Sequence, residues 1–233
     1  MTDRVAENYL KAYLSRHPVR VYKKGEIIIF QGEAPRSAYA VKSGTVKAYN
    51  ISVTGDEKPV AFYQESSLFP ASWIYGKAPS AVYYYEAFSP KVEVYVLDKN
   101  ELLSFIKRSP EMLYSQLENA ISDQLGATLR LNALQHSKAS DKLIYTLHYL
   151  ALTHGEVNQV DGSATIILDL THQDFANLTG LTRETAATEL NRLKKNGIIE
   201  YGKNTSYKIY MNKLNQLQND QFISDIQPAK LPT

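Results

Sequence analysis

Two charged side chains, Arg183 and Glu184, offer the most specific chemistry in this sequence. An arginine can donate two hydrogen bonds to a guanine edge, and a glutamate can accept one from the amino group of cytosine. Both residues follow Thr182, a residue type that caps helix N-termini. Polar side chains at the start of the outer helix of a helix-turn-helix reach base edges. Arg183 and Glu184 are therefore predicted to read bases in duplex DNA.

The stretch from 171 to 201, THQDFANLTGLTRETAATELNRLKKNGIIEY, contains the elements that would position them. Thr171 can cap a first helix, and Gly180 can end it. In the second helix the apolar spacing turns Ala186, Leu190 and Leu193 inward. The outward positions are then Arg183, Glu184, Ala187, Thr188 and Asn191. A packed helical hairpin with no role in DNA binding has the same outline.

A predicted wing and a local excess of positive charge favour DNA. Asn196-Gly197 is a strong turn signal, and IIEYGKNTSYKIYM then alternates like two strands, with Lys203 and Asn204 near the tip. Residues 171 to 213 hold seven Lys or Arg against four acidic residues, although the net charge of the whole chain is only +2. Lysines on such a surface can meet phosphates.

The phrases THQDFANLTGLTRET and LKKNGIIEY resemble the helix-turn-helix and the start of the wing in the CRP/FNR superfamily of bacterial transcription factors. VKSGTVKAYNISVTGDEKPVAFY resembles strands of that superfamily's N-terminal sensor. The resemblance covers nearly the whole chain. It implies an α+β fold: an N-terminal β-roll of the jelly-roll, cyclic-nucleotide-binding-like type, a long dimerisation helix, and a C-terminal winged helix-turn-helix.

The resemblance also implies which residues meet DNA. Base reading is expected from Arg183, Glu184, Ala187 and Thr188. Backbone contacts are expected from Thr171, His172, Thr182, Thr185, Lys194, Lys203 and Asn204. The sequence departs from well-known relatives at Thr188, where they place a second arginine. Thr188 can touch a thymine methyl or a phosphate instead, so we expect the operator to differ at one position.

The chain of 233 residues is long enough for two domains with separate cores. We predict a β-roll sensor over 1–108, a dimerisation helix over 109–137, a winged helix-turn-helix over 138–213 and a tail over 214–233. Strand-like segments and turns fill 19–97, and AYAVKSGTVKAYNI alternates around Ser43-Gly44 as a hairpin would. The tail is rich in Gln and Asn and offers little to bury.

An apolar stripe marks the long helix as a dimerisation element. Ser109 can cap it, and Pro110 suits its first turn. The stripe consists of Leu113, Leu117, Ile121, Leu125 and Thr128. Core packing on one side would explain part of this pattern, but the length of the helix between two domains favours pairing with a second copy of the chain. By resemblance, a homodimer is expected.

The sensor lacks the residues that hold known cofactors of the family. Cyclic-nucleotide-binding members carry Gly-Glu and later Arg-Ser, where this chain has Leu68-Phe69-Pro70 and Ala81-Val82. The chain has no cysteine, which removes cysteine-ligated iron–sulfur clusters. Haem would need an axial ligand, and His17 is the only histidine before the long helix. We therefore expect no cofactor: no cyclic AMP, no iron–sulfur cluster and no haem.

Aromatic side chains are concentrated in the same segment. They can fill the core of the roll, or they can line a pocket for an apolar or aromatic effector. The candidate pocket residues are Phe62, Phe69, Trp73, Tyr75, Tyr83 and Tyr85. The effector, if one is needed, is not identified by the sequence.

Other classes of protein fit less well. A metal enzyme of the cupin type would place several histidines on its strands, whereas the five histidines here include only His17 near the roll. No long apolar run or signal-like N-terminus is present, so we expect a cytoplasmic protein with no membrane association. The expected partners are double-stranded DNA, a second copy of the chain and RNA polymerase. The alternative is a small-molecule-sensing or protein-interaction module without sequence-specific DNA binding.

Overall fold

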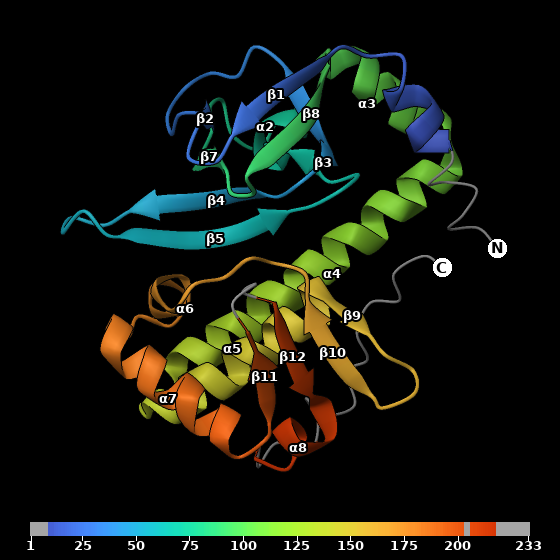
Figure 1. The fold of residues 1–233 in the computed structure, drawn as a ribbon. Helices are drawn as coiled ribbons and strands as arrows, with labels where there is room; N and C mark the ends of the chain where they lie inside the picture. Colours follow the sequence, from blue (N-terminus) through green and yellow to red (C-terminus); the bar gives the residue numbers. More distant parts are fainter. Residues whose placement is uncertain (1–8, 203–205, 218–233) are drawn as a thin grey trace. The chain divides into compact units, whose positions relative to one another are not determined.

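The computed structural model describes residues 9–202 and 206–217. The chain forms two compact units, Met1–Leu117 and Glu118–Thr233 (Figure 1). The boundary between them falls inside one long helix, α4, which runs from Pro110 to Gln135. The predicted limits of the domains stay predictions, but the predicted order of roll, long helix and winged domain agrees with the order of the elements.

The first unit is a β-roll, as the sequence predicts, and the structure shows that it consists of two four-stranded sheets. One sheet has the order β1-β8-β3-β6 and the other β2-β7-β4-β5. The strands are β1 (Val19–Lys23), β2 (Ile27–Ile29), β3 (Ala38–Ser43), β4 (Val46–Ile51), β5 (Glu57–Tyr63), β6 (Leu68–Phe69), β7 (Tyr84–Ala87) and β8 (Lys91–Leu97). A one-turn helix, α2 (Ala71–Ile74), follows β6 and was not predicted.

The predicted hairpin at Ser43-Gly44 is wrong. Strands β3 and β4 lie in different sheets, and the chain crosses between them at Gly44. Gly44 has a φ of +81°, and a Cβ there would lie 2.5 Å from the carbonyl oxygen of Lys91. Glycine is therefore required both by the backbone conformation and by the close approach of β8. The pattern of a half-buried hairpin fails because the first four residues of both strands are buried.

The core of the roll is largely aromatic and aliphatic. Phe69 is fully buried, with its ring centroid 5.3 Å from that of Tyr85 and 5.4 Å from that of Tyr39. Packing of this kind contributes both buried area and favourable ring geometry. A second apolar cluster contains Ile74 and Leu102.

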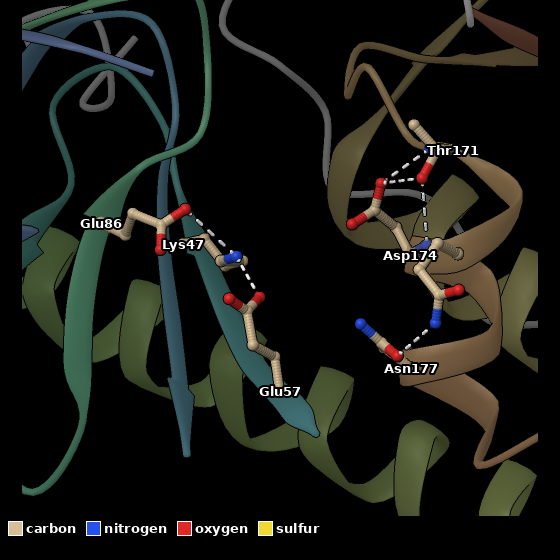
Figure 2. Close-up of polar contacts among 7 residues, drawn as sticks. Lys47, Glu57, Glu86, Thr171, Asp174 and Asn177 are labelled. Atoms are coloured by element: carbon tan, nitrogen blue, oxygen red, sulfur yellow. Dashed lines mark hydrogen bonds and ion pairs between the residues drawn. The ribbon is translucent and has the colours of Figure 1, made fainter. Parts of the chain in front are cut away.

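A charged residue is buried on the other sheet. Lys47 on β4 is only 4% exposed, and its Nζ lies 2.5 Å from Glu57 Oε2 and 3.3 Å from Glu86 Oε1 (Figure 2). The same ammonium lies 4.5 Å from the centroid of the Tyr49 ring. Burial, and then the neighbouring Glu86, raise the pKa of Tyr49. The cluster joins β4, β5 and β7 by ionic contacts that a buried charge needs.

Helices α3 (Lys99–Arg108) and α4 follow the roll. Four of the predicted dimer residues, Leu113, Leu117, Ile121 and Leu125, are between 40% and 56% exposed along α4, and Thr128 is exposed too. Another side of the helix, with Ala133 and Leu129, is buried. The sequence pattern therefore reflects an exposed apolar stripe that is separate from the buried side.

The second unit begins inside α4, and this part of α4 packs against α5 (Ala139–His154). A Cβ at Gly126 of α4 would lie 2.9 Å from Cγ2 of Thr153, so the two helices approach closely there. A four-stranded sheet has the order β11-β12-β10-β9. The elements are β9 (Gly155–Val157), β10 (Ser163–Ile166), α6 (His172–Thr179), α7 (Arg183–Lys195), β11 (Ile199–Tyr201), β12 (Tyr207–Tyr210) and α8 (Met211–Asn215).

Helix α8 was not predicted, and the predicted end of the domain at Lys213 falls inside it. Leu214, which was assigned to the tail, is fully buried. The prediction for the tail rests on its Gln- and Asn-rich composition. An average composition does not reveal that a single apolar side chain, Leu214, is buried.

Candidate nucleic-acid interface

Helix α6 is fixed by local contacts at both ends. The hydroxyl of Thr171 accepts from the backbone N–H of Asp174 at 3.2 Å, and Oδ2 of Asp174 accepts from the backbone N–H of Thr171 at 2.8 Å (Figure 2). This is a reciprocal capping box. At the other end Gly180 adopts the left-handed conformation with a φ of 68°, which ends the helix and starts the turn. The predicted cap and the predicted stop are both observed.

Helix α7 presents the predicted reading residues on its outer side. Thr182 caps it by accepting from the backbone N–H of Thr185 at 3.2 Å. The inward residues Ala186, Leu190 and Leu193 are buried, as the apolar spacing predicts. Arg183, Glu184 and Thr188 are exposed, and Ala187 is half-buried. Two helices joined by a glycine turn thus expose the polar N-terminal turn of the second helix.

The charged side chains of this turn have no partner in the part of the chain that the structure describes. Within residues 9–202 and 206–217, Arg183 and Glu184 make no side-chain hydrogen bond or ion pair. A guanidinium and a carboxylate that are exposed to water can replace hydrogen bonds to water with hydrogen bonds to base edges, and no contact within the described protein has to break first. The carboxylate of Glu184 also lies at the positive end of the helix dipole, which favours it whether or not DNA is bound.

The other predicted DNA residues lie around α6, α7 and the wing. Lys194 donates to the carbonyl oxygen of Tyr201 at 2.7 Å, and its Nζ lies 4.3 Å from the centroid of that ring. His172 meets the Tyr201 ring edge-on at 5.8 Å. The hydroxyls of Thr171, Thr182 and Thr185 take part in caps. Lys203 and Asn204 lie outside the described residues, between the paired strands β11 and β12.

Tyr201 is the residue that sequence reasoning missed. Its hydroxyl donates to Oδ1 of Asn191 at 2.8 Å, so one wing residue contacts Asn191 and Lys194 of the recognition helix and His172 of α6. The alternating pattern placed Tyr201 on a strand but could not name its partners, because they depend on how the wing packs. The helical period does predict that Asn191 faces outward, and its spacing from Glu184 and Thr188 places it on the same side of α7.

The six candidate pocket residues are divided among separate groups. Phe69 and Tyr85 stack in the core of the roll, and Phe62 packs against Phe88 with ring centroids 5.2 Å apart. Tyr83 packs against the same core cluster as Phe69, whereas Trp73 packs against the other cluster. The hydroxyl of Tyr75 donates to Gln116 at 3.1 Å. Their placement within the described chain gives no support to one pocket lined by all six.

An open depression of about 460 Å³ does lie beside one of them. Its lining includes Trp73 and Lys77, and Lys99 places its ammonium 4.4 Å from the Trp73 ring centroid. At the positions where relatives carry Gly-Glu and Arg-Ser, this chain has apolar residues instead. Leu68, Phe69 and Pro70 are buried, as is Ala81, and Val82 is an exposed aliphatic side chain.

Comparison with known proteins agrees with both units. Residues 19–109 match the family described as cyclic nucleotide-binding domain, and residues 141–224 match the Crp-like helix-turn-helix domain. The chain is 28% identical over 186 residues to the global nitrogen regulator of Nostoc sp.. The aligned region covers 79% of this chain and 82% of that protein.

Solved structures share the fold. A cyclic nucleotide-binding domain containing protein from Listeria monocytogenes superposes with a TM-score of 0.72 at 15% identity, covering 91% of this chain and 98% of that one. A CRP/FNR family transcriptional regulator from Thermus thermophilus superposes with a TM-score of 0.63 at 21% identity, covering 88% and 100%.

A β-roll, a long helix and a winged helix-turn-helix with an exposed recognition helix together define a DNA-binding transcription regulator. The two domain matches and the relatives narrow this class further. The chain belongs to the CRP/FNR superfamily. Along residues 9–202 and 206–217, every helix is too short or too polar to span a bilayer.

Proposed function

We propose that the chain acts as a homodimer that binds an inverted-repeat operator and activates transcription through contact with RNA polymerase. The proposal is supported by the exposed apolar stripe of α4, which a second copy would cover. A two-fold dimer presents two identical recognition helices, and such dimers bind half-sites about one helical turn apart. Activation is the commoner behaviour in the family, and a cytoplasmic location follows from action on DNA.

Base reading is assigned to Arg183, Glu184, Ala187 and Thr188. The single observation that carries the assignment is the N-terminal turn of α7, where Arg183 and Glu184 are exposed and without intramolecular partners among the described residues. A guanine facing Arg183 and a cytosine facing Glu184 would each contribute about 1–3 kcal/mol of discrimination. Thr188 would contact a thymine methyl or a phosphate, and Ala187 would make only apolar contact.

Phosphate contacts are assigned to Thr171, His172, Thr182, Thr185, Lys194, Lys203 and Asn204. Such contacts set the register on DNA without reading its sequence. The capping threonines can still accept or donate through their hydroxyls, because a hydroxyl has one proton and two lone pairs. Lys194 keeps two further N–H groups after its bond to the Tyr201 carbonyl.

The sensor is proposed to work without cyclic AMP, an iron–sulfur cluster or haem, and the protein is proposed to have no catalytic activity. The supporting observation for cyclic AMP is the buried apolar run Leu68–Pro70 and the pair Ala81-Val82, which supply no charge for a cyclic phosphate. The chain has no cysteine for a cluster. An unidentified effector would act by shifting the population of dimers whose recognition helices are aligned.

Selection from a randomised duplex pool at fixed, near-physiological salt tests this function. Purified effector-free protein should enrich an inverted repeat, and it should bind this duplex more tightly than a scrambled one. Arg183→Ala should lose the preference at one base pair of each half-site, with a fold-change of about 10 to 100. Lys195→Ala, at the exposed end of α7, is the matched control and should weaken both duplexes equally.

Uniform, weak and salt-dependent binding by the wild-type protein would contradict effector-free operator binding. An Arg183→Ala variant that keeps full discrimination would contradict the assignment of base reading. Sedimentation of Leu117→Glu and Ile121→Glu variants tests the dimer: a charge in the apolar stripe should give monomers, whereas an unchanged dimer would place the interface elsewhere.

A further inference from the structure

The recognition helix and the wing are joined by one hydrogen bond between side chains. The hydroxyl of Tyr201 on β11 donates to Oδ1 of Asn191 on α7 at 2.8 Å. Asn191 is exposed and lies seven residues after Glu184 and three after Thr188, so all three share the outer side of α7. Among the described residues, Asn191 is the one of these three whose side chain is hydrogen-bonded to the wing.

This bond fixes which atoms of Asn191 face outward. An asparagine amide has an oxygen that accepts and a nitrogen that donates twice, and the two can exchange places by rotation about the last torsion. Donation from Tyr201 holds the oxygen toward the wing. The Nδ2 group then points away from the Tyr201 hydroxyl, and within residues 9–202 and 206–217 neither of its N–H groups has an acceptor, so Asn191 becomes a donor of fixed orientation.

Tyr201 is itself well anchored. Its carbonyl accepts from Lys194, its ring lies 4.8 Å from that of Tyr207, and Tyr207 packs against Phe175 of α6 at 4.9 Å. Partial burial raises the pKa of the Tyr201 hydroxyl, which is therefore protonated and able to donate at neutral pH. An anchored donor loses little freedom on forming the bond, so the orientation of Asn191 is set before DNA arrives.

We propose that Asn191 is a further DNA contact, that its amide donates to a backbone phosphate beside the half-site, and that Tyr201 is the positioning residue that aims it. A phosphate is the better partner than a base for two reasons. Asn191 lies in the third turn of α7, beyond the N-terminal residues that reach base edges. A purely donating amide also cannot form the paired bonds by which asparagine reads adenine.

The inference rests on the proposed operator binding, and the duplex enriched by the wild-type protein is the probe. Tyr201→Phe removes only the hydroxyl, and Asn191→Ala removes the amide. Each should weaken binding about 3-fold to 10-fold, and the double variant should bind no more weakly than Asn191→Ala. Tyr210→Phe is the matched control, because its hydroxyl donates to Glu200 within the wing and should leave affinity unchanged.

Asn191→Asp separates contact from positioning. The aspartate can still accept from Tyr201 but replaces two donors with a negative charge, so it should bind more weakly than Asn191→Ala. Single methylphosphonate substitutions along each half-site give the second readout. One position should weaken the wild-type complex several-fold and have no effect on Asn191→Ala or Tyr201→Phe.

Each result has one meaning. Wild-type affinity for Asn191→Asp, or additive losses for Tyr201→Phe and Asn191→Ala, would overturn the proposal. So would relaxed discrimination at a base pair in Asn191→Ala, because Asn191 would then read a base. Unchanged unfolding temperatures exclude a folding defect in the variants. Failure of the wild-type protein to enrich any duplex would instead count against the proposed operator binding.

Discussion

The β-roll and the winged unit hold their polar groups in opposite ways. In the winged unit, Thr171 and Asp174 cap α6 through residues three apart, and Arg183 is exposed to water. In the roll, Lys47 is buried and paired with Glu57, ten residues away, and with Glu86 on a third strand. Local contacts thus shape the surface that is proposed to meet DNA, whereas contacts between residues far apart in the sequence hold the roll together.

The largest effect is expected from a substitution in the core of the roll, and it tests whether that core is filled by the protein's own side chains. Phe69→Ala should destabilise the roll by about 3–5 kcal/mol, because the ring is fully buried between Tyr39 and Tyr85. Urea unfolding followed by the fluorescence of Trp73, the single tryptophan, measures it. Phe30→Ala, with a largely exposed ring, is the control. A near-neutral Phe69→Ala would mean that the ring lines a ligand pocket rather than a packed core.

The buried ionic cluster should give the next largest effect. Lys47→Ala leaves Glu86 without its ammonium partner, and we expect a loss of about 3 kcal/mol, reduced by the partial exposure of Glu57. The same fluorescence titration applies. Lys58→Ala removes an exposed pair with Asp56 at 3.7 Å and should change stability by less than about 1 kcal/mol. Equal effects from both lysines would erase the contrast between buried and exposed charges.

The helix cap of the winged unit should matter less. Thr171→Ala breaks the capping box and should destabilise this unit by about 0.5–2 kcal/mol, since the backbone N–H of Asp174 loses the hydroxyl that accepts from it. Hydrogen exchange of the α6 amides is the measurement. Thr188→Ala, exposed on α7, should leave exchange unchanged. A cap effect as large as that of Phe69→Ala would show that local contacts dominate both units.

The smallest effect concerns Glu93, a half-buried carboxylate of the roll. Lys91, and then Lys42, hold the pKa of Glu93 at about 2, below the unfolded value of about 4.3. Because the folded pKa is depressed, its contribution to stability is present above about pH 4 and is lost as the pH falls toward 2. Glu93→Gln should therefore differ from wild type at pH 7 and converge with it near pH 2. A difference that is independent of pH would contradict this origin.

The winged unit was the more predictable from the sequence, for a physical reason. The ends of its helices are set by Thr171, Gly180 and Thr182, which act on backbone groups within three or four residues. The residue types alone therefore indicate where the helices begin and end. Strand partners in the roll are chosen by distant residues. Ser43-Gly44 has the look of a hairpin, yet the register of β3 is set by β8, some fifty residues later.

In the candidate DNA-binding site too, features set by local sequence could be predicted, and features set by packing between elements could not. The outward positions of α7 follow from its period, and the structure places Arg183, Glu184 and Thr188 on the surface as predicted. The bond between Tyr201 and Asn191 could not be predicted, because it depends on how a strand packs beside a helix. The six aromatic residues of the sensor were identified as core or pocket, and only packing could assign Phe69 and Tyr85 to the core.

The crossing of the chain at Gly44 has a consequence for the order in which the protein is made. Val19 of β1 pairs with Tyr95 of β8, and β3 pairs with β8 and β6, so neither strand has a neighbour among those synthesised just before or after it. Long sequence separation between paired strands slows folding. During translation β1 must therefore wait, unpaired, until about residue 97 has left the ribosome. The α6–α7 hairpin can form as soon as its own 25 or so residues emerge.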